Sequence, residues 1–255
     1  MPPRGARTTL LNTAPARAVR SSKYSVVFRA GKDKRRGGAR LRGVTRILQK
    51  KVWSQGFLPA RALFGEENKC GRWKGPDGGK RRGSAVDAQV CRLARLSDAR
   101  RRSSKKFHLV DMIFLALRTQ GMEQLMGQRV VCDVSRGLGT AVDLVCSKED
   151  ALILVEVKTG YAGDRTASAQ MKGRNAKMGV PFASANDTIL NRHFAQLTAT
   201  TAMFVREIET LRRLSEIGLK RVESVLVYAT NDDVEVHSLP EWWLKRGERL
   251  LSVLE

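Results

Sequence analysis

The sequence predicts an α/β fold with a mixed central sheet flanked by helices. Three segments carry apolar residues every three or four positions, which is the spacing of one face of a helix. Short runs rich in Val, Ile, Leu and Thr lie between turn signals, as β-strands do. In chain order the segments are two helices, three strands, one long helix, two strands and a final helix, and this alternation favours a sheet packed between helices.

Four helices are expected. The first begins at Ser84, which can cap it, and the second covers about 105–120. The long helix follows Asp187, another candidate cap, and a final amphipathic helix opens at Pro240. The apolar stripes are Val86, Val90, Leu93 and Leu96 in the first helix, Phe107, Val110, Phe114 and Leu117 in the second, and Leu190, Phe194, Leu197, Thr201, Phe204, Ile208 and Leu211 in the long one.

Five strands are expected, and a Gly/Ala/Lys-rich loop covers 160–186 between the third strand and the long helix. The predicted strands cover about 128–134, 139–146, 151–158, 223–229 and 233–238.

Positive charge is concentrated in the first part of the chain. Residues 1–105 hold 28 of the 47 Lys and Arg residues but only 6 of the 25 Asp and Glu residues, so they account for the whole net charge of +22. A basic block of this kind attracts polyanions, and nucleic acid is the usual partner. No basic amphipathic helix with an aromatic face suggests a membrane surface instead.

This distribution predicts three regions. Residues 1–46 are expected to be a flexible basic tail or transit segment, because they hold a single acid, Asp33, and little apolar surface to bury. Residues 47–82 are expected to be a basic, loop-rich extension, and residues 83–255 the folded domain. The tail suits DNA binding first, but its composition also fits a mitochondrial or plastid transit peptide, and 32–36 could direct nuclear import.

The sequence predicts an intracellular protein that does not span a membrane. No stretch approaches 18 consecutive apolar residues. The cysteines are widely spaced and form no C-x-x-C pair, so free thiols in a reducing compartment are expected. Mitochondrion, nucleus and virus-infected cell all stay open as locations, as does the oligomeric state. The four cysteines are Cys70, Cys91, Cys132 and Cys146.

The most informative pattern is a pair of acids and a lysine on two adjacent predicted strands. Glu156 and Lys158 are two residues apart in one strand, so they share a face. If the strand before it pairs as a hairpin through the polar turn 148–150, Asp143 approaches Glu156. Two carboxylates bind a hard divalent cation, and a lysine adds a point charge for a phosphate. The alternative is a surface hairpin with one salt bridge.

Asp143, Glu156 and Lys158 resemble the motif of the PD-(D/E)XK nuclease superfamily. The resemblance covers about residues 80–238 and implies a restriction-endonuclease-like α-β-β-β-α-β core. It further implies Mg²⁺, with Mn²⁺ as a substitute, held by Asp143, Glu156 and the carbonyl of Val157. One departure is Val142, where the motif name has proline.

Two further segments are similar to superfamily members. Asp87 on the first helix matches a third acid that reaches the metal site, although an acid in the first turns also suits the helix dipole. On the long helix, Gln196 resembles the active-site glutamine of RecB-like exonucleases of viral, phage or organellar type, and Thr200 stands where the family often has tyrosine. The alternative for Gln196 is an ordinary half-buried helix residue. His193 shares its face and is expected to contact DNA or to be satisfied in the core.

Basic residues near these motifs are expected to bind the phosphate backbone without sequence specificity. They are Arg81 and Arg82 before the first helix, and Arg165, Lys172, Arg174 and Lys177 in the 160–186 loop.

These features together predict a Mg²⁺-dependent deoxyribonuclease that acts on DNA, an exonuclease of repair, recombination or replication. Three alternatives stay open: a structure-selective endonuclease such as a Holliday junction resolvase, a DNA-binding protein with a nuclease fold but no turnover, and an RNA-associated basic protein.

Overall fold

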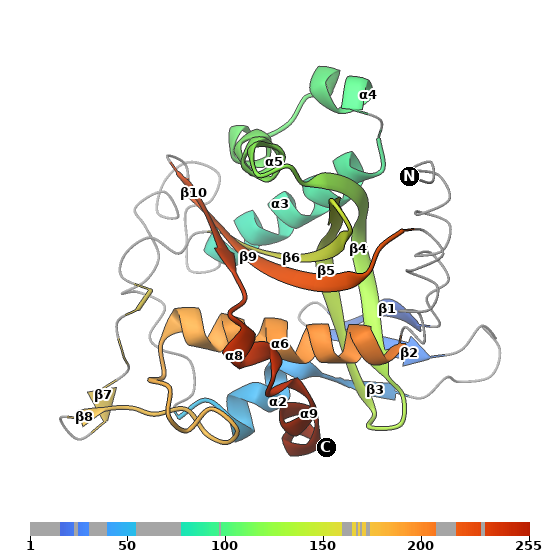
Figure 1. The fold of residues 1–255 in the computed structure, drawn as a ribbon. Coiled ribbons are helices and arrows are strands. Elements are labelled where there is room, and N and C mark those ends of the chain that lie inside the picture. The colour runs from blue at the N-terminus through green and yellow to red at the C-terminus, as the bar shows by residue number, and fades with distance from the viewer. Residues whose placement is uncertain are drawn as a thin grey trace.

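A computed structural model of the chain confirms the α/β class, with a mixed, open central sheet flanked by helices (Figure 1). Within the described residues the sheet has eight strands, and two short strands form a separate pair. The structure describes residues 16–22, 25–30, 40–54, 78–96, 98–159, 165–166, 168, 170–171, 174–207, 218–230 and 233–255.

The middle of the sheet is an antiparallel meander extended by a parallel strand. β4 pairs with β5 and β5 with β6, all antiparallel, while β9 runs parallel to β6 and β10 returns antiparallel to β9. β6 is buried from its first residue to Val157, because helices cover both of its faces. The strands are β4 (Glu123–Asp133), β5 (Leu138–Lys148), β6 (Ala151–Thr159), β9 (Arg221–Ala229) and β10 (Val234–Ser238).

Helices cover the sheet on two sides (Figure 1). α3 (Gly78–Ala94) and α5 (His108–Thr119) bury their apolar stripes on one face, with α4 (Asp98–Ser103) beside them. The other face is covered by α2 (Val44–Lys51), α6 (Ile189–Glu207), α8 (Glu241–Leu244) and α9 (Gly247–Leu254). No helix among the described residues is long and apolar enough to cross a membrane.

Glycine at position 127 lets α3 approach the sheet closely. A Cβ atom on Gly127 would lie 2.8 Å from the Cα and the carbonyl oxygen of Cys91 on α3, closer than any side chain permits. The helix that carries Asp87 is therefore pressed against β4 by backbone contact.

The N-terminal part contributes more than the sequence predicts. β3 (Arg40–Gly43) pairs parallel with the start of β5, and α2 buries Val44, Ile47 and Leu48 in the main core. β1 (Ala16–Ser22) and β2 (Ser25–Ala30) extend the sheet beyond β3. Residues 40–54, which the predicted boundaries assign to the tail and the loop-rich extension, thus contribute a strand and a helix to the folded domain.

Other boundaries shift by a few residues. α3 begins at Gly78 rather than Ser84, and β4 begins at Glu123 rather than near 128. The predicted loop 160–186 contains two short strands, β7 (Gln170–Met171) and β8 (Arg174–Asn175). Ile208 and Leu211, the last two positions of the long helix stripe, lie outside the described residues.

The long helix α6 is capped by Thr188, not by Asp187. The hydroxyl oxygen of Thr188 accepts the backbone N–H of Asn191 at 3.0 Å. Asp187 is fully buried, and its two carboxylate oxygens accept Nε and Nη2 of Arg192 at 2.6 and 2.8 Å. Ser54 donates its N–H and its hydroxyl to the same carboxylate. Asp187 therefore fastens the segment after α2 to the first turn of α6.

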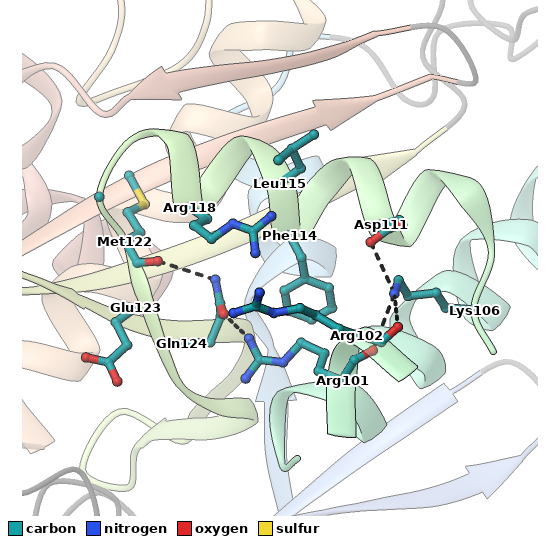
Figure 2. A pocket seen from close by; sticks show the side chains of 11 residues that line it. Arg101, Arg102, Lys106, Asp111, Phe114, Leu115, Arg118, Met122, Glu123 and Gln124 are labelled. Atoms are coloured by element: carbon teal, nitrogen blue, oxygen red, sulfur yellow. Dashed lines mark hydrogen bonds and ion pairs between the residues drawn. The ribbon is translucent and has the colours of Figure 1, made fainter. Parts of the chain in front are cut away.

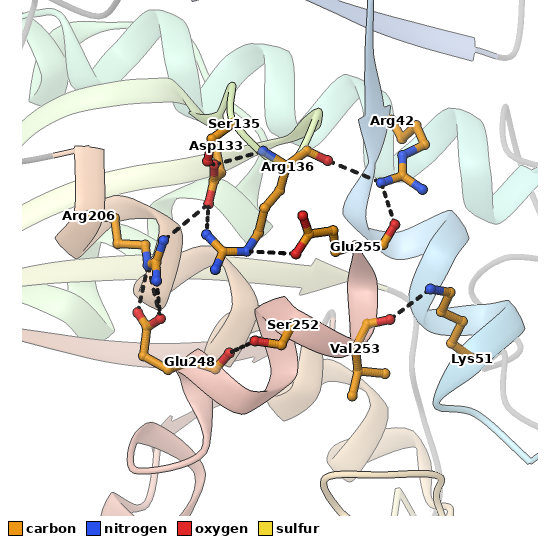
Figure 3. A network of polar contacts seen from close by, with 10 residues as sticks. All are labelled: Arg42, Lys51, Asp133, Ser135, Arg136, Arg206, Glu248, Ser252, Val253 and Glu255. Carbon is orange, nitrogen blue, oxygen red and sulfur yellow. Dashed lines mark hydrogen bonds and ion pairs between the residues drawn. The ribbon is translucent and has the colours of Figure 1, made fainter.

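A second polar network joins the C-terminal helix to the β4–β5 turn (Figure 3). Asp133 at the end of β4 accepts Arg136 Nη1 at 2.9 Å and lies 3.7 Å from Arg206 of α6. Arg206 in turn pairs with Glu248 of α9. These contacts lie at the turn between β4 and β5, whereas Asp143 lies in the middle of β5, so they support the scaffold.

We predict that Asp187→Ala destabilises the protein by about 3–5 kcal/mol, because it leaves the buried Arg192 guanidinium without its carboxylate. Denaturant unfolding followed by circular dichroism measures the change. Glu248→Ala, which breaks an exposed ion pair, should cost less than about 1 kcal/mol. Equal losses in the two variants would contradict this account of α6.

Candidate active site

Asp143 and Glu156 lie where strands β5 and β6 separate. The ladder of backbone pairs between the two strands ends at Leu144 and Val155. Leu144 is the residue next to Asp143 in β5, and Val155 is the residue next to Glu156 in β6. Beyond that point the N–H of Val157 donates to Asp143 Oδ2 at 2.8 Å, so a side-chain oxygen replaces the partner strand. The N–H and C=O of one strand residue point to the same side. The carbonyl of Val157 therefore also faces the place where β5 and β6 separate. We call this place, with Asp143 and Glu156, the fork.

Glu156 and Lys158 lie on the face of β6 that α6 covers. Lys158 Nζ lies 2.5 Å from Glu156 Oε1, and Gln196 Nε2 donates to the same oxygen at 2.7 Å. Gln196 Oε1 accepts Lys158 Nζ at 3.4 Å, which closes a triangle. Glu156 is only 4% exposed. A buried carboxylate needs such partners, because its loss of hydration would otherwise cost several kcal/mol.

Asp87 reaches the same place from the opposite face of the sheet. Gly83 of α3 packs against the end of β6, since a Cβ there would lie 3.5 Å from Thr159 Oγ1. Asp87 follows one turn later. Burial raises the pKa of Asp87 to about 6, the Lys158 charge acts to lower it, and the Glu156 charge raises it further. Asp87 therefore lies within the electrostatic reach of both β6 residues.

The fork concentrates negative charge. The pKa of Asp143 is raised well above its ordinary value, first by burial and then by the charges of Glu156 and Asp87, while Lys158 and the N–H of Val157 act in the opposite direction. Three carboxylates thus interact electrostatically with one ammonium, and Glu156 contacts it directly. At neutral pH a second positive charge would relieve their repulsion.

The oxygen atoms at the fork are of the chemical type that binds a hard cation. Among the described residues, no hydrogen bond is made to Asp143 Oδ1 or Glu156 Oε2, or to the Asp87 carboxylate. Carboxylate and carbonyl oxygens are the ligands that Mg²⁺ and Mn²⁺ prefer. However, no three His, Cys, Asp or Glu side chains of the described residues are already arranged around one metal position. Binding would thus require side-chain rotation, and Lys158 would have to share Glu156.

His193, one turn before Gln196, is buried beside this cluster. Its Nδ1 lies 2.7 Å from the hydroxyl of Tyr228 on β9. Burial, followed by the Lys158 charge, lowers the pKa of His193 well below its ordinary value, which keeps the imidazole neutral. The guanidinium of Arg165 lies 4.4 Å from the centre of the Tyr228 ring and pairs with Glu235. A structural role for His193 fits these contacts better than direct contact with DNA.

Tyr228 is the neighbour that sequence patterns did not single out. It pairs with Lys158 in the parallel β6–β9 ladder, so it lies directly beside the lysine. Its position in a predicted strand was visible in the sequence. The order of strands in the sheet, which places β9 next to β6, was the missing information.

The predicted backbone-binding residues have different surroundings. Arg81 is exposed at the start of α3, whereas Arg82 is only 4% exposed. Arg174 and Lys177 are exposed, and Lys177 donates to Asn186 Oδ1 at 2.7 Å. Lys172 lies outside the described residues.

No family model and no curated protein matches the chain.

We predict a pH-dependent gain in stability for Asp87→Asn. Because the pKa of Asp87 rises from 3.8 to about 6 on folding, its contribution to stability is greatest below about pH 4 and is lost as pH rises through about 6. The stability difference between variant and wild type should grow over this window to about 1–2 kcal/mol, allowing for the partial exposure of the group. Denaturant unfolding in a chelator, from pH 4 to 8, measures it.

A constant difference across that pH range would show that Asp87 ionises as a surface carboxylate does. Asp111→Asn is the matched control, because Asp111 is an exposed helix aspartate paired with Lys106.

Proposed function

We propose that the protein is a metal-dependent deoxyribonuclease that hydrolyses phosphodiester bonds. One observation carries the proposal: Asp143 and Glu156 lie side by side at the β5–β6 fork, and Lys158 contacts Glu156. Mg²⁺ is the proposed cofactor, with Mn²⁺ as a substitute, because the donors are hard oxygens in a small, acidic site.

The order of elements supports the same proposal. α3, β4, β5, β6, α6 and β9 follow one another as α-β-β-β-α-β, with α4 and α5 inserted after α3 and the short pair β7–β8 inserted before α6. This order is similar to the restriction-endonuclease-like core of PD-(D/E)XK nucleases, and the three motif residues occupy β5 and β6. Thr200 differs from the RecB-like pattern: it is fully buried and donates to the Gln196 carbonyl at 2.9 Å. Here Thr200 orders the α6 backbone behind Gln196.

Each side chain receives a role from its position. Asp143, Glu156 and the carbonyl of Val157 would hold the cation, with Asp87 completing its ligands. When bound, the cation supplies Lewis acidity to a water molecule and to the scissile phosphate. Lys158 would orient the attacking oxygen and offset charge that develops on the phosphate. Gln196 holds Glu156 and Lys158 at a fixed separation through its two amide atoms.

DNA is the proposed substrate because exposed basic residues lie on α3 and before α6, the two helices that carry Asp87 and Gln196. Exposed Arg81 lies one and a half turns before Asp87 on α3, and Arg174 and Lys177 are exposed in the segment before α6. Such a surface binds the phosphate backbone without reading sequence. The proposed role is an exonuclease of repair, recombination or replication.

Two related functions are separated by substrate. A structure-selective endonuclease such as a resolvase would cleave four-way junctions, an endonuclease without that selectivity would also cleave closed circular DNA, and an exonuclease requires a linear end. A DNA-binding protein without turnover would bind all three substrates and cleave none. Purified protein with Mg²⁺, tested on linear, circular and branched DNA against a chelator control, distinguishes them.

We predict that Glu156→Gln and Lys158→Ala each lower the cleavage rate at least a thousandfold while DNA affinity measured in a chelator stays within about threefold. The reason is that these residues act on the reacting phosphate, and the exposed basic surface provides most of the binding. Glu223→Gln, an exposed acid at the start of β9, is the control and should cleave normally. Cleavage retained by either fork variant excludes the assigned roles.

We also predict that Mg²⁺ or Mn²⁺ raises the thermal midpoint of the wild type at neutral pH. A cation relieves repulsion among the fork carboxylates, and any ligand that binds only the folded state stabilises it. Asp143→Asn should be more stable than the wild type in a chelator and gain less from the metal. Thermal unfolding with and without metal measures both effects, and an equal metal response in the two proteins would place the cation elsewhere.

A further inference from the structure

A pocket of about 290 Å³ lies at the far end of α3, between α4, α5 and the start of β4 (Figure 2). Its floor is formed by Phe114 and by Arg101, whose guanidinium lies 5.0 Å from the Phe114 ring centre. Arg101 is fixed there by Gln124 and by the carbonyls of Leu93 and Leu96. The floor is therefore a built and positively charged surface.

Two arginines on the rim of the pocket differ from Arg101, because no hydrogen-bond acceptor holds their guanidinium groups within the described residues. Arg102 and Arg118 are exposed, and among the described residues neither guanidinium has an acceptor or an ion-pair partner. Figure 2 shows both guanidinium groups turned toward each other at the centre of the pocket. Three guanidinium groups thus gather in one concave site, where each raises the energy of the others unless an anion joins them.

The two acids that line the pocket do not neutralise these arginines. Asp111 lies 3.2 Å from Lys106, so its charge is paired. Figure 2 shows the carboxylate of Glu123 directed away from the arginines. The site therefore keeps a positive excess and attracts anions. Guanidinium groups bind phosphate oxygens in pairs, which makes a phosphate the best-fitting ligand.

The solvent-facing side of α3 connects the pocket to the fork. The residues exposed or facing outward along it lie at steps of three and four and include no acid; they are Arg81, Ser84, Ala88, Arg92 and Arg95. Arg81 lies at the fork end, and Arg92 at the pocket end donates to the Lys105 carbonyl. From Asp87 to Leu93, where Arg101 attaches, the helix advances about 9 Å. Along the axis of duplex DNA, which rises about 3.4 Å per nucleotide of one strand, that distance corresponds to about two to three nucleotides.

We propose that the outer face of α3 and the pocket of Arg101, Arg102 and Arg118 form a second phosphate-binding site, which holds the DNA backbone away from the carboxylate fork. It rests on the proposed function in taking DNA as the polyanion and the fork as the place of the reacting phosphate. The site anchors the strand several nucleotides from the reacting phosphate. It adds to affinity equally for all sequences, because it contacts no base edge.

The test compares the full-length double variant Arg102→Ala/Arg118→Ala with Lys245→Ala/Arg249→Ala. The second pair removes the same charge from the C-cap of α8 and from α9, on the opposite side of the sheet, and both of its side chains are exposed. Fluorescence anisotropy in a chelator measures binding to labelled single-stranded and duplex DNA between 50 and 200 mM salt. Circular dichroism and thermal unfolding check that each variant is folded.

The pocket variant should bind DNA about ten- to a hundredfold more weakly at low salt, with a salt dependence reduced by about 0.7–0.9 per lost contact. The control pair should bind like the wild type. Equal affinity and slope for the two double variants overturns the proposal, as does a wild type that binds no DNA. Calorimetry with inorganic phosphate adds a third outcome: a pocket that binds phosphate while DNA binding is unchanged serves a free anion, which also overturns it.

This result is independent of catalysis. If Lys158→Ala and the wild type both fail to cleave but the pocket variant binds DNA weakly, the second site stands and the nuclease proposal falls. If Lys158→Ala abolishes cleavage but the pocket variant binds DNA like the wild type, the nuclease proposal stands and the second site falls.

Discussion

The site depends on the hydrogen bond from the N–H of Val157 to Asp143. Antiparallel strands normally satisfy each other's backbone groups until both end, and a buried N–H left unpaired would cost about 1–3 kcal/mol. Here the carboxylate of Asp143 takes over that function at the point where β5 leaves β6. The strands can therefore separate without an unsatisfied donor. The same bond fixes Asp143 next to Glu156, so the structural and the proposed chemical roles of this aspartate are inseparable.

The fork is destabilising in isolation, and the scaffold compensates for it. Burial and mutual repulsion raise the pKa values of Asp143 and Asp87, which means that their ionised forms oppose folding at neutral pH. Around them the core is apolar and continuous on both faces of the sheet. α6, which supplies Gln196, is fixed at its first turn by the buried pair of Asp187 and Arg192. Rigid support of this kind is what keeps like charges within reach of one cation.

Local sequence patterns were enough to predict the fork. The features that the sequence did not predict depend on contacts between residues far apart in the chain. Asp143, Glu156 and Lys158 belong to one hairpin whose polar turn sets the register, so alternation was enough to place them together. By contrast, β3 is four residues long and rich in arginine, and it joins the central sheet by pairing with Leu138 and Gly139, nearly a hundred residues away. Asp187 looked like a helix cap because neither Ser54 nor the direction of the Arg192 side chain can be read from spacing.

Negative and positive side chains lie on opposite faces of α3. One face of α3 approaches the backbone of β4 and presents Asp87 to the fork, while the opposite face carries only arginines as charged residues. A negative site that must receive a polyanion repels it, so cations have to lie along the approach rather than in the site itself. Lys158 alone cannot fill that role, because Glu156 and Gln196 already engage it. In the proposed function, the arginines of α3 and of the α4–α5 pocket would supply that attraction without entering the fork, which would leave the acids available to a metal ion.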